Sequence, residues 1–341
     1  MRPPYLQLVL LLVVIMNSGA AHAGEWKRFL DEDGVKGYTR SVRGSALYEV
    51  RSTIIVPARI EVVGAVLRDV EGLKRPGSSC LEARLIERQD ANHYTFYVAY
   101  DFPWPVSDRD AVIQVVNRYD LDKGRVIADL RAVSHPRLPR RKDRLRITDL
   151  RSQFVIEYIS RERTGVVYTS RADPTGHIPT FLVNRGSKSS LKDNALDLRK
   201  AVKNPVYVRA AASSSDAALV ERFTSDPRKL TRIIERRLGE LISDPALVAR
   251  LVADRRVLGE LTGGSGRVGE ILLHGWGSYE SKAEAVRVLL RALLAGRVPA
   301  AKLDGFVADR RLIGRILYGK GGDKAVATLL AGGHRQQKGG G

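Results

Sequence analysis

The 341-residue chain contains a single cysteine, Cys80, so it cannot form a disulfide bond within itself. Its stability must therefore come from the burial of apolar groups and not from covalent links. After residue 24 no apolar stretch is long enough to span a bilayer, and the stretch 286–295 is interrupted by two arginines. The six histidines show no spacing typical of a metal site, and we expect neither a metal nor a cofactor.

The first 23 residues have the layout of a secretory signal peptide. Arg2 precedes an almost unbroken apolar run at 6–16, and Ala21-His22-Ala23 is a small-x-small cleavage pattern. The apolar run is too short to span a bilayer. We expect cleavage after Ala23 and a soluble, periplasmic mature chain. The alternative is an uncleaved N-terminal anchor.

The chain carries a formal net charge of +19, with 57 Lys and Arg against 38 Asp and Glu residues. A strong positive charge commonly indicates nucleic-acid binding, but an exported protein meets little nucleic acid, so we expect no nucleic-acid partner. An anionic membrane surface suits the charge better, because each basic group near it contributes about 1 kcal/mol. The alternative is an arginine-rich composition that serves no partner.

Residues 34–173 carry the pattern of an antiparallel sheet. Short segments mix β-branched or aromatic residues with polar ones, and turn-forming pairs separate them. Two helices interrupt this pattern, one at 57–70 and a longer one at about 179–202. The predicted strands cover residues 35–42, 47–56, 81–88, 94–102, 111–119, 126–133, 145–158 and 165–172.

From about residue 216 the sequence predicts helices. Residues 229–242 are strongly amphipathic, and the segment 251–259 is nearly repeated at 306–314. Two copies are fewer than a solenoid needs, so we expect a compact helical bundle.

These patterns divide the chain into regions. We predict one domain at 24–209, a soft linker at 210–215, a helical domain at 216–331 and a disordered tail at 332–341.

The most informative segment is residues 101–110, which reads Asp-Phe-Pro-Trp-Pro-Val-Ser-Asp-Arg-Asp. The two prolines around Trp104 prevent a continued strand and fix an aromatic-bearing bend. We interpret Trp104, Asp108, Arg109 and Asp110 as a structural clamp of this loop, because such polar residues bond the local backbone. The alternative is contact with a ligand.

Pro-Trp-Pro followed by Asp-Arg-Asp and an apolar strand resembles the signature of START (StAR-related lipid transfer) domains. Trp26 and the segment 33–40 resemble the opening helix and first strand of that family. Residues 80–88 resemble the strand before the signature, and 173–184 resemble the approach to the C-terminal helix. The resemblance covers about residues 24–205.

Two segments depart from the family pattern. Residues 72–77 lack the aromatic residue usual in that loop, and residues 137–142 are unusually basic. Both departures concern the identity of the ligand and not the fold.

The resemblance implies an α+β, helix-grip fold: a curved antiparallel sheet around a long C-terminal helix, here followed by an all-α helical domain. Such a fold encloses a deep apolar cavity for one lipid, which could be a sterol, hopanoid, fatty acid or phospholipid. Enclosing an acyl chain in this way gains about 0.8 kcal/mol per CH₂ group. No catalytic group is required for that.

One stripe of the helix at 179–202 has three-four spacing and is apolar toward its far end but polar at two positions nearer its start. We predict that the apolar members line the lid side of the cavity and that the polar members meet the polar end of the ligand. The alternative is that the stripe completes the hydrophobic core. The apolar members are Phe181, Leu191, Ala195 and Leu198, and the polar members are Asn184 and Lys188.

The sequence therefore predicts a periplasmic lipid carrier or lipid sensor, not an enzyme. It offers no convincing catalytic pair, and Cys80 has no nearby histidine in the sequence. Two other functions fit the same features. One is a helix-grip enzyme, such as a cyclase or hydrolase, that acts on a hydrophobic substrate. The other is a platform whose helical domain binds a partner protein.

Overall fold

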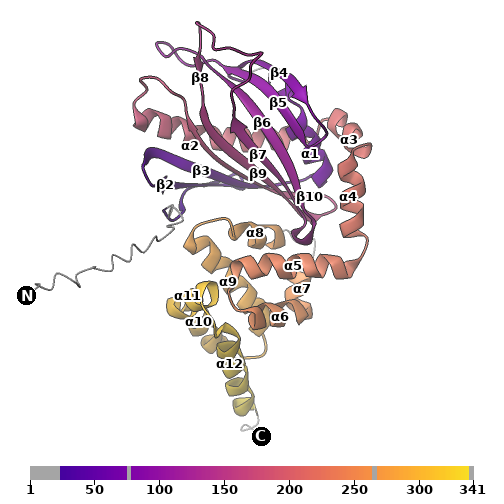
Figure 1. The fold of residues 1–341 in the computed structure, drawn as a ribbon. Helices are drawn as coiled ribbons and strands as arrows, with labels where there is room; N and C mark the ends of the chain where they lie inside the picture. The colour runs from indigo at the N-terminus through magenta and orange to yellow at the C-terminus, as the bar shows by residue number, and fades with distance from the viewer. Residues whose placement is uncertain (1–23, 75–77, 263–266, 338–341) are drawn as a thin grey trace, which may run out of the picture.

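The computed structural model describes residues 24–74, 78–262 and 267–337. These residues form an α+β fold in which a curved sheet wraps around a long helix, with further helices packed against the other side of the sheet (Figure 1). This confirms the predicted fold class. The predicted signal peptide, 1–23, lies outside the described residues, so its cleavage stays a prediction.

The described part of the chain contains ten strands in one sheet, and neighbours along its main path are antiparallel. Their order is β1-β2-β3-β10-β9-β7-β6-β5-β4, and the short β8 pairs in parallel with β6. The strands are β1 (Lys27–Glu32), β2 (Val35–Val42), β3 (Ser45–Val56), β4 (Cys80–Arg88), β5 (His93–Tyr100), β6 (Arg109–Asp120), β7 (Arg125–Ala132), β8 (Leu145–Arg146), β9 (Asp149–Ser160) and β10 (Arg163–Asp173).

Two helices belong to the sheet's concave side, and the others follow in the second half of the chain (Figure 1). Short 3₁₀ helices η1 (Glu71–Leu73) and η2 (Leu121–Lys123) connect strands and helices. The α-helices are α1 (Ile60–Arg68), α2 (Thr180–Ala201), α3 (Pro205–Ala212), α4 (Ser215–Thr224), α5 (Pro227–Leu241), α6 (Pro245–Ala253), α7 (Arg255–Thr262), α8 (Arg267–His274), α9 (Tyr279–Leu294), α10 (Ala300–Ala308), α11 (Arg310–Tyr318) and α12 (Gly322–Gln337).

Among the residues that the structure describes, the first element is a strand that begins at Lys27, and Trp26 before it is not in a helix, so the helix that the resemblance implies at Trp26 is wrong. Asp33 and Gly34 both have positive φ angles, of 52° and 73°. This is the backbone of a two-residue hairpin turn. It brings Glu32 opposite Val35, so β1 gains backbone hydrogen bonds along β2 that a short isolated helix could not replace.

Strands β9 and β10 are buried on both faces. Ile156 and Val166 point into the core that contains α2, whereas Val155 and Val167 pack against Leu273 of α8 on the opposite face. Adjacent apolar residues of this kind are typical of strands covered on two sides. The C-terminal helices therefore supply the second cover of the sheet.

A buried ionic network joins the sheet to these helices. Glu157 of β9 is fully buried and accepts hydrogen bonds from Arg125 Nε at 2.7 Å and Trp276 Nε1 at 2.8 Å. Arg237 of α5 also pairs with Glu157 and donates to the Tyr158 carbonyl at 2.9 Å. A buried carboxylate needs such partners, because its desolvation is costly.

The repeated segment of the sequence is a repeated structure. Asp254 precedes α7 and accepts from the backbone of Arg256, and Asp309 precedes α11 and accepts from that of Arg311, at 3.0 Å and 2.8 Å. Each aspartate therefore caps the second helix of a pair. The pairs α6–α7 and α10–α11 pack around α9, which carries the centre of the helical core.

Two predicted segments, the linker and the C-terminal tail, differ from the helices that the structure shows. The predicted linker at 210–215 lies largely in helices, because Asn204 caps α3 and Ser214 caps α4. Helix α12 continues to Gln337, into the predicted disordered tail, and 338–341 lie outside the described residues. The division into two domains stays a prediction.

Candidate functional site

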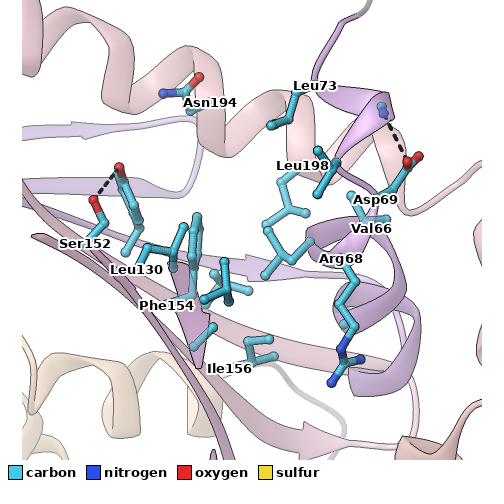
Figure 2. Close-up of a pocket in the computed structure, with 18 of the residues that line it drawn as sticks. Val66, Arg68, Asp69, Leu73, Leu130, Ser152, Phe154, Ile156, Asn194 and Leu198 are labelled. Atoms are coloured by element: carbon cyan, nitrogen blue, oxygen red, sulfur yellow. Dashed lines mark hydrogen bonds between the residues drawn. The ribbon is translucent and has the colours of Figure 1, made fainter. Parts of the chain in front are cut away.

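A cavity of about 280 Å³ lies between the concave face of the sheet and helices α1 and α2. Figure 2 shows Leu130 and Phe154 of the sheet on one side of it, with Val66 of α1 and Leu198 of α2 on the other. Most of the wall is made of aliphatic and aromatic side chains. Such an enclosed, mainly apolar space with a few polar groups is typical of a small-molecule site.

The apolar wall follows from the alternation of side chains along three strands. Inward-facing positions are two residues apart in a strand. On β9 the polar Ser152 is the one polar member of an otherwise apolar inward row, and on β7 the small Ala128 lies between larger residues and leaves room. The inward rows are Ile113 and Val115 on β6, Val126, Ala128 and Leu130 on β7, and Leu150, Ser152, Phe154 and Ile156 on β9.

The predicted stripe of α2 meets this cavity only at its far end. Ala195 and Leu198 line the cavity, and the neighbouring Asn194 also lines it. Leu191 is 1% exposed and lies on the same buried side of the helix, but it is not among the residues that line the cavity. These three predicted residues therefore face the core side of the domain.

The other three predicted residues lie in a separate surface groove next to Phe29 and Tyr48. The Asn184 side chain accepts from the Tyr48 backbone N–H at 2.9 Å and donates to the Ala46 carbonyl at 3.1 Å. The Lys188 ammonium lies 5.2 Å from the Phe29 ring. Phe181 is 69% exposed.

The length of α2 explains this separation. A helix rises about 1.5 Å per residue, so the stripe from Phe181 to Leu198 extends over roughly 25 Å. Its start therefore passes beyond the cavity and crosses the β2–β3 hairpin instead. Asn184 and Lys188 are bound to that hairpin, and the structure does not bring them together with Ala195 and Leu198.

A family model described as START domain matches residues 12–206. The chain belongs to the START domain family. START domains bind and transfer lipids, and one relative, the mouse phosphatidylcholine transfer protein, is 23% identical over 192 residues, covering 55% of this chain and 89% of that protein. An uncharacterized protein of Pseudomonas aeruginosa is 34% identical over 176 residues, covering 52% of this chain and 86% of that protein.

A solved structure shows the same fold. The crystal structure of human STARD10 aligns with a TM-score of 0.50 and 23% identity, covering 55% of this chain and 76% of that chain. At this identity the likeness shows the START fold alone. The family match ends at residue 206, so helices α4 to α12 lie beyond it.

The signature loop of this START domain acts as a clamp at the end of the sheet. Arg109 is 1% exposed and donates to the carbonyls of Pro174 at 3.0 Å and Thr175 at 2.9 Å, which precede α2. Asp110 accepts from Tyr97 and Arg146, at 3.0 Å and 2.6 Å. These contacts agree with the predicted structural role.

Of the other two residues of the predicted clamp, Asp108 makes a contact within the loop and Trp104 does not. Asp108 accepts from the Phe102 backbone N–H at 3.3 Å, across the bend. Trp104 is 93% exposed, so its ring takes no part in the clamp and faces solvent.

Sequence reasoning missed the polar groups of the START cavity. Arg68 of α1 and Asn117 of β6 line it at one end, and Ser152 lines it toward the other (Figure 2 shows Arg68 and Ser152 far apart). The Ser152 hydroxyl lies 3.4 Å from the Tyr168 hydroxyl and 2.8 Å from that of Ser170. Asn117 follows Ile113 and Val115 at the two-residue spacing, and this polar break in an apolar row was the available signal.

In the described ranges, no group of three or more His, Cys, Asp or Glu residues could hold a metal ion. None of the described helices is long and apolar enough to cross a membrane. Cys80 is a buried free thiol, and burial raises its pKa.

Proposed function

We propose that this START protein binds one hydrophobic lipid in the cavity between the sheet, α1 and α2, as a carrier or sensor. The observation that carries this proposal is the mainly apolar cavity of about 280 Å³. Apolar matter moved there from water gains about 0.8 kcal/mol per CH₂ group. No reacting group is needed, and we infer a non-catalytic role.

The size of the cavity bears on the class of lipid. Small-molecule pockets commonly measure roughly 300–1,000 Å³, so the volume of this cavity, about 280 Å³, is just below that range. A single-chain lipid such as a fatty acid or its derivative suits it better than a sterol, hopanoid or two-chain phospholipid. Any of the larger lipids would require the cavity to expand.

We further propose that the protein acts in the periplasm and meets an anionic membrane. Phe181 and Leu182 are exposed at the start of α2, and Arg185 and Lys188 follow them along the same helix. Exposed aromatic and basic groups together favour the interface of an anionic bilayer. This gives Phe181 and Lys188 a role in docking, since the structure places them outside the cavity.

The decisive experiment is native mass spectrometry of protein purified from an envelope fraction, followed by extraction and identification of the bound lipid. We expect one lipid per chain. Ala128→Leu, which adds bulk to the cavity wall, should reduce lipid occupancy, whereas Ala249→Leu on the exposed side of α6 should not. Protein that is empty and takes up no lipid from vesicles would contradict the proposal, and turnover of a lipid ester would contradict the non-catalytic role.

A further inference from the structure

The inward row of β6 changes from apolar to polar at the end of the cavity. Ile113, Val115 and Asn117 all line the cavity from this strand. Asn117 is 7% exposed, and its Nδ2 has no hydrogen-bond partner among the residues that the structure describes. A buried amide donor without a partner is costly, and Asn117 lies on the cavity wall, where a ligand group can satisfy this donor.

Arg68 lies on the same stretch of wall. It is the last residue of α1, and its Nη2 donates to the Asp216 carboxylate at 3.1 Å and to the Tyr119 hydroxyl at 3.2 Å. Its Nε is buried and has no partner within the described ranges. Tyr119 is two residues from Asn117 on β6, so both side chains point to the same face of the sheet.

The carboxylate that balances Arg68 comes from outside the family match. Asp216 lies in the first turn of α4, is 3% exposed, and pairs with Arg68 and Tyr119. A second carboxylate, Asp69, lines the cavity nearby and accepts from the Tyr207 hydroxyl at 2.7 Å. The positive charge of Arg68 is therefore already compensated before any ligand enters.

We propose that Asn117 Nδ2 and Arg68 Nε form a subsite that donates hydrogen bonds to an uncharged oxygen of a single-chain lipid, such as the carbonyl of an ester or amide. This inference rests on the proposed function, because it assumes that the cavity holds a lipid. Both free groups are donors, so the ligand must supply an acceptor. A carboxylate would be buried beside Asp216 and Asp69 without a free cation, which disfavours it.

The test compares three ligands of similar chain length in the full-length protein: methyl palmitate, palmitic acid at pH 8, and hexadecane, each displacing a fluorescent fatty-acyl probe. We expect the ester to bind about tenfold more tightly than hexadecane and more tightly than palmitate, as one good hydrogen bond provides. Asn117→Leu should reduce the preference for ester over hexadecane to about twofold. Val115→Leu, on the same wall, should change binding of all three ligands in parallel.

The outcomes separate the subsite from the function. If no ligand displaces the probe and the probe itself does not bind, the proposed function fails. If the ligands bind but Asn117→Leu keeps the full ester preference, or if palmitate binds more tightly than the ester, the subsite is wrong while lipid binding stands. Should Asn117→Leu not fold, Asn117→Asp replaces the donor by an acceptor of nearly the same shape and must lose the ester preference.

Discussion

The two faces of the sheet bury polar groups in opposite ways. On the convex face, Glu157 accepts hydrogen bonds from Arg125 and Trp276 and pairs with Arg237 of α5. On the concave face, Asn117 keeps a buried amide nitrogen that no described residue satisfies. The Glu157 carboxylate is thus satisfied by the chain itself, whereas the unpartnered Asn117 donor lies on the wall of a cavity.

This difference distinguishes an internal interface from a ligand site. The C-terminal helices bring the groups that Glu157 needs, so they act as a permanent partner of the sheet. An unpartnered nitrogen alone does not mark a site, since Arg237 Nε also has no partner among the described residues. What distinguishes Asn117 is its position on the cavity wall.

The largest expected effect comes from Glu157→Gln, which removes the charge between two buried arginines. Breaking a buried ion pair from one side costs about 3–5 kcal/mol of the free energy of unfolding. Urea unfolding followed by tryptophan fluorescence measures it, because Trp276 is a partner of Glu157. Glu284→Gln, in an exposed pair with Arg287, is the control and should cost less than about 1 kcal/mol. Equal effects of the two changes would show that the convex network is not structural.

The START fold was predictable because its signals are local or periodic. Turn pairs such as Asp33-Gly34 and the apolar stripe of residues 179–202 fix the hairpins and the long helix. The cover of the convex face was not predictable, because it depends on which distant segment packs there. Adjacent apolar residues in β9 and β10 indicated a two-sided cover, but not that α8 provides it.

The site was predictable only in part. Ala195 and Leu198 line the cavity, but periodicity along α2 could not show where the cavity ends. Asn184 and Lys188 share the stripe, yet both contact Tyr48 of the β2–β3 hairpin. The partners of Arg68 lie on β6 and, far along the chain, on α4, and pairs of such large sequence separation leave no pattern in a single sequence.

The second largest effect is the loss of stability at low pH that His274 should cause. This residue of α8 lies on the convex side of the sheet, and its Nδ1 has no partner among the described residues. Burial, with the nearby Lys36 and Arg28, lowers the pKa of His274 to about 4. In the unfolded chain its pKa is near 6.5, so the unfolded state binds the proton first as the pH falls. The protein should therefore lose about 3 kcal/mol of stability between pH 6.5 and pH 4.

Unfolding free energies measured across this pH range test the contribution of His274. His274→Phe removes the titrating group and should flatten the curve, leaving only the contribution of the carboxylates. His93→Phe, in an exposed pair with Asp90, is the control and should leave the curve between pH 4 and 6.5 nearly as steep as before. A curve unaffected by His274→Phe would contradict the assignment.

A smaller effect on the free energy of unfolding is expected for Asp216→Asn. Asp216 lies on α4 and pairs with Arg68, which lines the cavity on the concave side. Arg68 then loses its charge partner while keeping a hydrogen-bond acceptor, and the expected loss is about 2 kcal/mol of unfolding free energy. The uncompensated Arg68 should also raise the affinity for palmitate relative to methyl palmitate several-fold. Asp304→Asn, in an exposed pair with Arg291, should alter neither quantity. If the ratio of the affinities for palmitate and methyl palmitate does not change, Asp216 has no influence on the ligand site.

The smallest effect on the free energy of unfolding is expected for Asn117→Leu, and its sign should be opposite to that of Asn184→Leu. Asn117→Leu removes an unsatisfied buried donor from an apolar wall, so the ligand-free protein should be unchanged or more stable by up to about 1 kcal/mol. Asn184→Leu removes two hydrogen bonds to the β2–β3 hairpin and should cost about 1 kcal/mol, with ligand selectivity intact. Chemical unfolding of both variants without lipid compares them directly. A marked loss of stability in Asn117→Leu would mean that the folded chain satisfies the Asn117 amide, and the contrast with Glu157 on the convex face would disappear.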